Sequence, residues 1–231
     1  MRRPFHRNLI LPALETALLL VDLQEEQRSD PQYNAAGITT VLGQAARLLK
    51  AARAGGLPIA HAQYIRDFNV IAPRPFEVIS EQGRPMFSAA ASGQTDICAE
   101  VAPVTGDAVF VKNDASSFEG THLHDWLQAQ GTHWLVVCGV WTEACIAATV
   151  RDAIALGYRV LLVKDACASG SKYMHETAVL HLANRLYGGG ICDTDRACDL
   201  LAGRGAGVWQ IGDPVPFRFD ETTLTALYNA L

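Results

Sequence analysis

The 231-residue sequence has no dense run of lysine and arginine, no apolar stretch of membrane-spanning length and no CxxC pair. Because it lacks a basic cluster and has a formal net charge of −5, nucleic acid and anionic membranes are not expected partners. A membrane span needs about 20 consecutive apolar residues, so no membrane partner is predicted. Pro12 and Glu15 interrupt the apolar N-terminal segment, and we expect no signal peptide.

The cysteines are scattered along the chain rather than grouped. They are Cys98, Cys138, Cys145, Cys167, Cys192 and Cys198. This usage is typical of free thiols in a reducing compartment, so we expect a cytoplasmic protein. Hydrophobic residues make up 49% and charged residues 19%, which allows a sizeable core. We therefore expect residues 1–231 to form a single domain.

Strand-like and helix-like segments alternate along the chain. Strands are expected at 16–22, 57–64, 107–112, 133–139, 158–165 and 206–212, and helices at 38–56, 121–131, 142–157 and 172–189. This alternation predicts an α/β fold in which helices cover both faces of a parallel sheet. Residues 65–106 are rich in proline and glycine and are predicted to form a lid or wall loop.

Three chemically active side chains end or follow the predicted strands. Asp22 closes the first strand, Lys112 closes the third, and the fourth leads through a glycine to Cys145. Ligands bind beyond the carboxyl ends of strands in an open parallel sheet, so these side chains should meet at one edge. Alone, each residue has a structural explanation as a cap, a surface lysine or a small buried cysteine. The three together favour a catalytic site.

Cys145 falls in the first turn of a predicted helix, directly after a strand. Thr142 is a good N-cap, which places Cys145 at about the third helical position. Unpaired N–H groups and the helix dipole favour a thiolate there, and Lys112 would favour it further. From position alone, a buried structural cysteine explains Cys145 as well as a nucleophile does, and the other cysteines are expected to be structural.

Other motifs match cofactor sites poorly. The segment "YGGGICD" (187–193) follows a helix and lacks GxGxxG, so no dinucleotide site is expected. His122 and His124 lie two residues apart on a predicted helix and face different ways, and His175 and His181 are also badly spaced for one site. We therefore expect neither a metal nor a cofactor.

Three segments, in order, carry a pattern that belongs to a known family. They are "ALLLVDLQ" (17–24), "GDAVFVKNDASSFEGTHL" (106–123) and "VVCGVWTEACIAATVRDAIALGYRVLLVKDACAS" (136–169). From about residue 16 to 190 the chain resembles the isochorismatase-like cysteine hydrolase superfamily. The resemblance implies a six-stranded, mostly parallel sheet with helices on both faces, a Rossmann-like three-layer sandwich. It also implies association as a homodimer or homotetramer.

The resemblance further implies roles for particular residues. The catalytic set of the family corresponds here to Asp22, Lys112 and Cys145. A cis peptide is implied at Val140–Trp141, and the backbone N–H groups of Trp141 and Cys145 would form an oxyanion hole.

Departures from the family pattern narrow the expected activity. Isochorismatases proper lack the cysteine, so Cys145 points to the C–N hydrolases of the superfamily. The nicotinamidase branch has an aspartate and two histidines for a metal near the second strand, whereas this chain offers His61, Gln63 and Asp67. We therefore expect no metal there and do not expect nicotinamide as the preferred substrate.

The predicted function is a cysteine-dependent hydrolase that cleaves the C–N bond of a small amide, carbamoyl or ureido substrate through a thioester. Residues expected to contact the substrate are Gln24, Tyr64, Arg66, Phe87, Phe118 and Trp141. Two alternatives remain open at this point, a thiol redox protein that uses Cys145 and a non-catalytic relative that binds a small molecule. A nucleotide-binding protein is a further alternative, although no phosphate loop is present.

Overall fold

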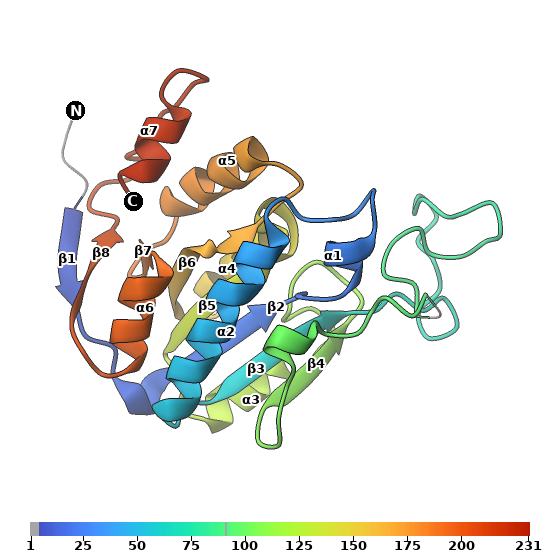
Figure 1. The fold of residues 1–231 in the computed structure, drawn as a ribbon, viewed down its shortest axis with the longest axis horizontal. Coiled ribbons are helices and arrows are strands. Elements are labelled where there is room, and N and C mark those ends of the chain that lie inside the picture. Colours follow the sequence, from blue (N-terminus) through green and yellow to red (C-terminus); the bar gives the residue numbers. More distant parts are fainter. Residues whose placement is uncertain (1–4, 91) are drawn as a thin grey trace.

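An eight-stranded sheet forms the middle layer of the molecule (Figure 1) in the computed structural model, which describes residues 5–90 and 92–231. The strand order is β1-β8-β7-β6-β5-β2-β3-β4. The strands are β1 (Phe5–Leu9), β2 (Thr16–Val21), β3 (Ile59–Tyr64), β4 (Ala108–Lys112), β5 (Trp134–Val140), β6 (Arg159–Ala168), β7 (Gly190–Cys192) and β8 (Ala206–Gln210). Strands β2 to β7 pair in parallel, and β8 runs antiparallel to both of its neighbours.

The sheet confirms the predicted fold class and corrects the predicted number of strands from six to eight. Strand β1 was missed because "FHRNL" is short and half polar, with no buried run to mark it. Strand β7 was missed because it has only three residues and lies in the glycine-rich segment 187–193. The last predicted strand, 206–212, is the antiparallel strand β8.

Helices cover both faces of the sheet (Figure 1). Helices α2 (Ile38–Ala54) and α6 (Thr194–Leu201) pack side by side on one face. The other face carries α3 (Leu123–Ala129), α4 (Ala147–Ala155) and α5 (Lys172–Ala183), and α5 contacts α7 (Leu224–Asn229) near the C-terminus. The short helix α1 (Glu26–Ser29) follows β2. No helix of the described residues is both long and apolar enough to cross a membrane.

Strands β2 and β5 lie side by side at the centre of the sheet and are fully buried. The chain continues from β2 to β3 on one side and from β5 to β6 on the other, so the connections diverge from this pair. At Gly139, a Cβ atom would lie 2.0 Å from the carbonyl oxygen of Val21, and φ is +129°. Only glycine allows this close approach of the two strand ends. A crevice at such a divergence is the usual ligand site of open α/β sheets.

The segment 65–106 is largely irregular, as predicted, and part of it extends away from the body of the molecule (Figure 1). It contains one 3-10 turn, η2 (Ala99–Val101), and its residue Ala91 lies outside the described residues. Arg66 fixes the loop from within. Its guanidinium makes two 2.7 Å hydrogen bonds to the carboxylate of Glu77 and also donates to the carbonyl oxygen of Ile71.

Candidate active site

Asp22 and Lys112 form a buried ion pair at the carboxyl ends of β2 and β4. The Nζ atom of Lys112 lies 2.8 Å from Oδ2 of Asp22, and only 1% of Lys112 is exposed. The same ammonium group donates to the carbonyl oxygens of Asp114 and Ala115, at 3.1 and 3.0 Å. Within the described part of the chain, Oδ1 of Asp22 has no hydrogen-bond partner. It is therefore free to accept a proton from another group in the site.

Cys145 lies in a wide, π-helical turn, η3 (Thr142–Ile146), between β5 and α4. This turn corrects the prediction that Thr142 caps an ordinary helix, because the Thr142 hydroxyl donates instead to the carbonyl oxygen of Ala168 at 2.9 Å. The residue at the N-cap position is Trp141, and its side chain makes no cap. A π-helical turn is a frequent feature of functional sites in helices.

The backbone before Cys145 has the geometry that the sequence resemblance implied. The Val140–Trp141 peptide bond is cis. The carbonyl oxygen of Trp141 accepts from the N–H groups of Ala144 and Ile146, at 3.0 and 3.2 Å. The N–H of Cys145 lies between these two donors and does not share that carbonyl.

Asp22 and Cys145 face the same cavity, which has a volume of about 230 Å³. Its lining residues are Asp22, Gln27, Tyr33, Phe87, Val140, Trp141, Ala144 and Cys145. Asp22, Lys112 and Cys145 interact with one another directly, since each alters the pKa of the other two. The structure thus brings together the three side chains that the sequence singled out.

Burial raises the pKa of the Cys145 thiol to about 12, and the negative charge of Asp22 adds to this effect. The positive charge of Lys112 lowers the pKa of Cys145, but this effect is smaller than the combined effect of burial and Asp22. Burial and the charge of Asp22 thus oppose the thiolate that the position of Cys145 in the turn favours. The thiol is protonated at neutral pH, so any reaction at sulfur needs a base beside it.

Burial also raises the pKa of Asp22, an effect that Lys112 partly opposes. For Lys112 itself, burial works to lower the pKa, but the neighbouring Asp22 and Cys145 prevail and the pKa lies above its usual value. Burial therefore favours the protonated form of Asp22, whereas the neighbouring ammonium group of Lys112 favours the carboxylate. The 2.8 Å contact is that of an ion pair, so we take Asp22 as an ionised carboxylate whose proton affinity is increased.

Several residues that the sequence suggested as substrate contacts lie elsewhere. Gln24 is buried, and its side-chain amide forms hydrogen bonds with the backbone of Tyr64 and Thr95. Arg66 is paired with Glu77 inside the loop, and Phe118 stacks on Tyr158. None of the three predicted contacts lines the cavity of Cys145.

Two other predicted contacts, Phe87 and Trp141, do line the cavity, and Tyr64 stands behind Phe87 with ring centroids 5.7 Å apart. Sequence reasoning missed Gln27 and Tyr33. Gln27 accepts a 2.6 Å hydrogen bond from Nε1 of Trp141. It belongs to the charged segment 25–30, in which no apolar or periodic pattern marks a residue of the cavity.

A chain of hydrogen bonds supports the nucleophile turn from the C-terminal helix. The Thr142 hydroxyl donates its proton to the carbonyl oxygen of Ala168. Nδ1 of His175 must therefore be the donor in its 2.8 Å hydrogen bond to the Thr142 oxygen. Nε2 of His175 then accepts from the Tyr228 hydroxyl at 3.1 Å. This requires a neutral imidazole, and burial lowers the pKa of His175 to about 4. Tyr228 is thereby connected to the turn that carries Cys145.

We expect the substitution Tyr228→Phe to weaken this support. It removes one hydrogen bond and leaves His175 without its donor, which costs about 1 kcal/mol of unfolding free energy. If the turn loosens, kcat should fall by roughly two- to fivefold with little change in KM. Steady-state kinetics and thermal unfolding measure both effects.

Tyr187→Phe is the matched control for this prediction, because the Tyr187 side chain is exposed. The control should leave kcat unchanged. A Tyr228→Phe enzyme that melts earlier but keeps the parent kcat would show that the hydrogen-bond chain serves stability alone.

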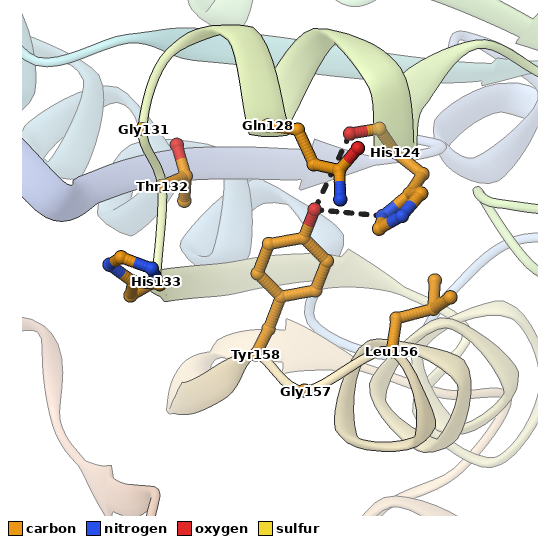
Figure 2. Close-up of a pocket in the computed structure, with 8 residues that line it drawn as sticks. All are labelled: His124, Gln128, Gly131, Thr132, His133, Leu156, Gly157 and Tyr158. Carbon is orange, nitrogen blue, oxygen red and sulfur yellow. Dashed lines mark hydrogen bonds between the residues drawn. The ribbon is translucent and has the colours of Figure 1, made fainter.

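A second cavity, of about 390 Å³, lies beside the amino-terminal ends of β5 and β6. Figure 2 shows the Tyr158 side chain reaching toward α3, where its hydroxyl lies 2.9 Å from Nδ1 of His124. The other lining residues are Gln128, Gly131, Thr132, His133, Leu156 and Gly157. This set includes neither a cysteine nor a carboxylate, so the cavity lacks the nucleophile and base that the site at Cys145 possesses.

The candidates for metal binding also remain apart. His61 is buried, with Nε2 3.3 Å from Oδ2 of Asp107, and Gln63 donates to the carbonyl oxygen of Thr95. In residues 5–90 and 92–231, no three His, Cys, Asp or Glu side chains are grouped so that they could hold a metal ion.

A divergent parallel sheet with a thiol at a strand-to-helix turn, beside a carboxylate and a lysine, is an arrangement suited to a class of hydrolases that use a nucleophilic cysteine. The chain belongs to one family of that class, because the family described as Isochorismatase domain matches residues 16–196. This confirms the resemblance read from the sequence.

The chain is also similar to named relatives and to a solved structure. It is 27% identical over 207 residues to the ureidoacrylate amidohydrolase of Serratia proteamaculans, covering 81% of this chain and 83% of the relative. It is 29% identical over 178 residues to the maleamate amidohydrolase of Pseudomonas putida, covering 73% and 79%. The fold is shared with a cysteine hydrolase from Pseudomonas syringae, with TM-score 0.75, 21% identity and coverage of 87% and 98%.

Proposed function

We propose that the protein is a cysteine amidohydrolase that cleaves the C–N bond of a small amide, carbamoyl or ureido compound. The observation that carries this proposal is the cavity shared by the Cys145 thiol and the Asp22 carboxyl group, with Nζ of Lys112 2.8 Å from that carboxyl group. The names of two relatives support the same reaction class, since both are amidohydrolases. No cofactor enters the proposed reaction.

In the first half of the reaction, Asp22 takes the proton of the Cys145 thiol as the sulfur attacks the substrate carbonyl carbon. The oxygen of the tetrahedral intermediate accepts hydrogen bonds from the N–H groups of Trp141 and Cys145. Protonated Asp22 then gives its proton to the departing nitrogen as the C–N bond breaks, which leaves a thioester on Cys145. The raised pKa of Asp22 suits a group that must first accept a proton and then return it.

In the second half, a water molecule attacks the thioester carbonyl and gives a proton to Asp22. The C–S bond breaks, the sulfur is reprotonated, and the carboxylic acid leaves. Lys112 keeps Asp22 ionised and oriented between these transfers, because its own two carbonyl contacts hold the ammonium group in place. Lys112 is thus a positioning residue in the proposed reaction.

An ammonia-release screen over amides, carbamoyl compounds and ureides tests this function, with mass spectrometry of the enzyme during turnover as a second measurement. We expect ammonia from at least one compound, together with an enzyme species heavier by the mass of the acyl group. The added mass should map to the peptide that contains Cys145. Steady turnover with an unmodified Cys145 would contradict the thioester route.

The redox alternative predicts a different outcome. After peroxide treatment, a redox thiol would cycle through a sulfenic acid to a disulfide. Cys145 is the only cysteine among the residues that line its cavity, and burial raises its pKa to about 12, so neither a resolving thiol nor a reactive thiolate supports that route. Thiol titration after peroxide would show a disulfide at Cys145 if the redox alternative held.

A further inference from the structure

The walls of the Cys145 cavity are almost wholly apolar and are rich in aromatic rings. Tyr33, Phe87 and Trp141 provide rings, and Val140 and Ala144 complete the surface. The ring centroids of Tyr33 and Phe87 lie 5.1 Å apart at an interplanar angle of 73°, so these two rings pack edge to face. Aromatic walls of this kind favour flat, apolar groups, which can stack against them.

The Trp141 wall is held in place from two sides. Its Nε1 atom donates to Gln27, and a Cβ atom at Gly170 would lie 2.7 Å from the Trp141 ring. The ring therefore rests directly on the backbone of Gly170 and has little room to move. Because this wall is rigid, the cavity already has its shape and polarity before a substrate binds.

Charge in the cavity is negative rather than positive. Asp22 is the one carboxylate among the lining residues, none of the lining residues is a lysine, arginine or histidine, and Gln27 is neutral. The ammonium group of Lys112 is not part of the lining and is already engaged by Asp22 and two carbonyl oxygens. None of the lining residues can therefore offer a cation to a carboxylate on the substrate.

The neighbouring cavity does not supply the missing cation. It has a volume of about 530 Å³ and shares Tyr33 with the first. Its charged lining residues are Glu26, Asp30, Asp67, Arg66 and Arg84. The guanidinium of Arg66 is paired with Glu77, so Arg84 is the remaining cation in a lining that contains three carboxylates. An anionic group that extended past Tyr33 would enter a net negative region.

We propose that this site takes a small, uncharged, planar amide of the aryl or alkenyl type and discriminates against amides that carry a carboxylate. This inference rests on the proposed amidohydrolase function and names its substrate class. Ureidoacrylate and maleamate, which appear in the names of two relatives, are both carboxylates. The cavity is smaller than the roughly 300–1,000 Å³ typical of drug-sized ligands, so the substrate is compact.

The same charge pattern favours release of the product. Hydrolysis converts a neutral primary amide and water into a carboxylate and ammonium. The carboxylate forms in an apolar cavity, next to ionised Asp22, where an unpaired anion is strongly disfavoured. We therefore expect product acids to inhibit the enzyme much more weakly than neutral amides of the same shape.

Three amides test the inference. They are benzamide, maleamate and (Z)-4-methylpent-2-enamide, in which an isopropyl group replaces the carboxylate of maleamate with the same number of heavy atoms. We expect kcat/KM for the neutral isostere to exceed that for maleamate by about 100-fold, because burial of an unpaired carboxylate is costly. Benzamide should also be a better substrate than maleamate.

The neutral isostere and maleamate differ in intrinsic reactivity, and this difference cancels when their ratio of kcat/KM is compared between two variants. Ala144→Lys adds a cation to the cavity wall, and Ala144→Met adds similar bulk without charge. The ratio of kcat/KM between the neutral isostere and maleamate should fall about tenfold in the lysine variant relative to the methionine variant.

The possible outcomes separate this inference from the function on which it rests. If wild-type enzyme hydrolyses maleamate as well as its neutral isostere or better, the substrate class is overturned and the amidohydrolase function stands. If none of the three amides yields ammonia or an acyl-enzyme, the substrate class fails, and the wider screen described above decides the function separately. A preference for the neutral compounds that declines in Ala144→Lys supports the inference.

Discussion

Replacing Cys145 by serine should lower kcat by roughly 10⁴- to 10⁶-fold on any true substrate, the scale seen when a nucleophile is removed from a hydrolase. A serine hydroxyl is a far weaker acid than a thiol, and Asp22 cannot remove its proton efficiently. The fold should survive, because the change at Cys145 is one of oxygen for sulfur at a half-buried position. Ammonia release and thermal unfolding, measured on the same preparation, test both statements.

Cys198→Ser is the matched control, since Cys198 is also half-buried but lies on α6, on the sheet face opposite α4. The control should retain full activity. If Cys145→Ser also kept the activity of the wild type while remaining folded, the proposed nucleophile would be wrong, whatever the substrate.

Replacing Lys112 by methionine should give the second large effect. The substitution leaves the buried Asp22 carboxylate without its cation, so the pKa of Asp22 rises further. A larger fraction of Asp22 is then protonated, and that fraction cannot act as the base. We expect kcat/KM at pH 7 to fall by roughly 10²- to 10⁴-fold, the usual contribution of a general base.

The pH dependence distinguishes loss of the base from general damage. The acid limb of the kcat/KM profile reports ionisation of Asp22 in the free enzyme, so it should move to higher pH in Lys112→Met. Unfolded Asp22 titrates near pH 3.9, whereas the folded variant keeps the proton to a higher pH. The variant is therefore least destabilised at acidic pH, and its deficit in Tm should grow as pH rises through the folded pKa of Asp22.

Lys50→Met is the control for the lysine substitution, because Lys50 is exposed on α2. It should change neither the activity nor the pH profile. A Lys112→Met enzyme whose acid limb coincides with that of the wild type would show that Lys112 does not set the ionisation of Asp22.

Much of the candidate site could be predicted because topology alone brings its parts together. Asp22, Lys112 and Cys145 follow three different strands, and parallel pairing forces the carboxyl ends of those strands to one edge. The buried runs "TALLLV" and "WLVVCGV" mark the two central strands clearly in the sequence. A periodic apolar pattern is the strongest signal that a single sequence provides.

The walls of the cavity could be predicted only in part, because Phe87 and Trp141 were expected as substrate contacts whereas Tyr33 was not. Tyr33 and Phe87 come from irregular segments whose course depends on tertiary contacts such as the pairing of Arg66 with Glu77. Such contacts have no periodic pattern in the sequence. Arg66 was expected to contact the substrate, but its guanidinium fixes the loop instead.

The pKa of Cys145 could not be predicted from the local sequence for a different reason. Position in a helix is a local property, and the local dipole argument favoured a thiolate. Burial and the charge of Asp22 are properties of the folded molecule, and they raise the pKa of Cys145 instead. The link from Tyr228 to Thr142 through His175 was equally hidden, because it joins residues far apart in the chain.

The pairing of β2 with β5 has a consequence for synthesis on the ribosome. The register pairs Leu18 with Val136. More than half of the chain must therefore be synthesised before β5, the central neighbour of β2, emerges from the exit tunnel. Until then a strand of leucine and valine has one unpaired edge, which is the kind of surface that aggregates or recruits chaperones. Slow translation between these strands should therefore lower the yield of native protein, and co-expressed holdases should restore it.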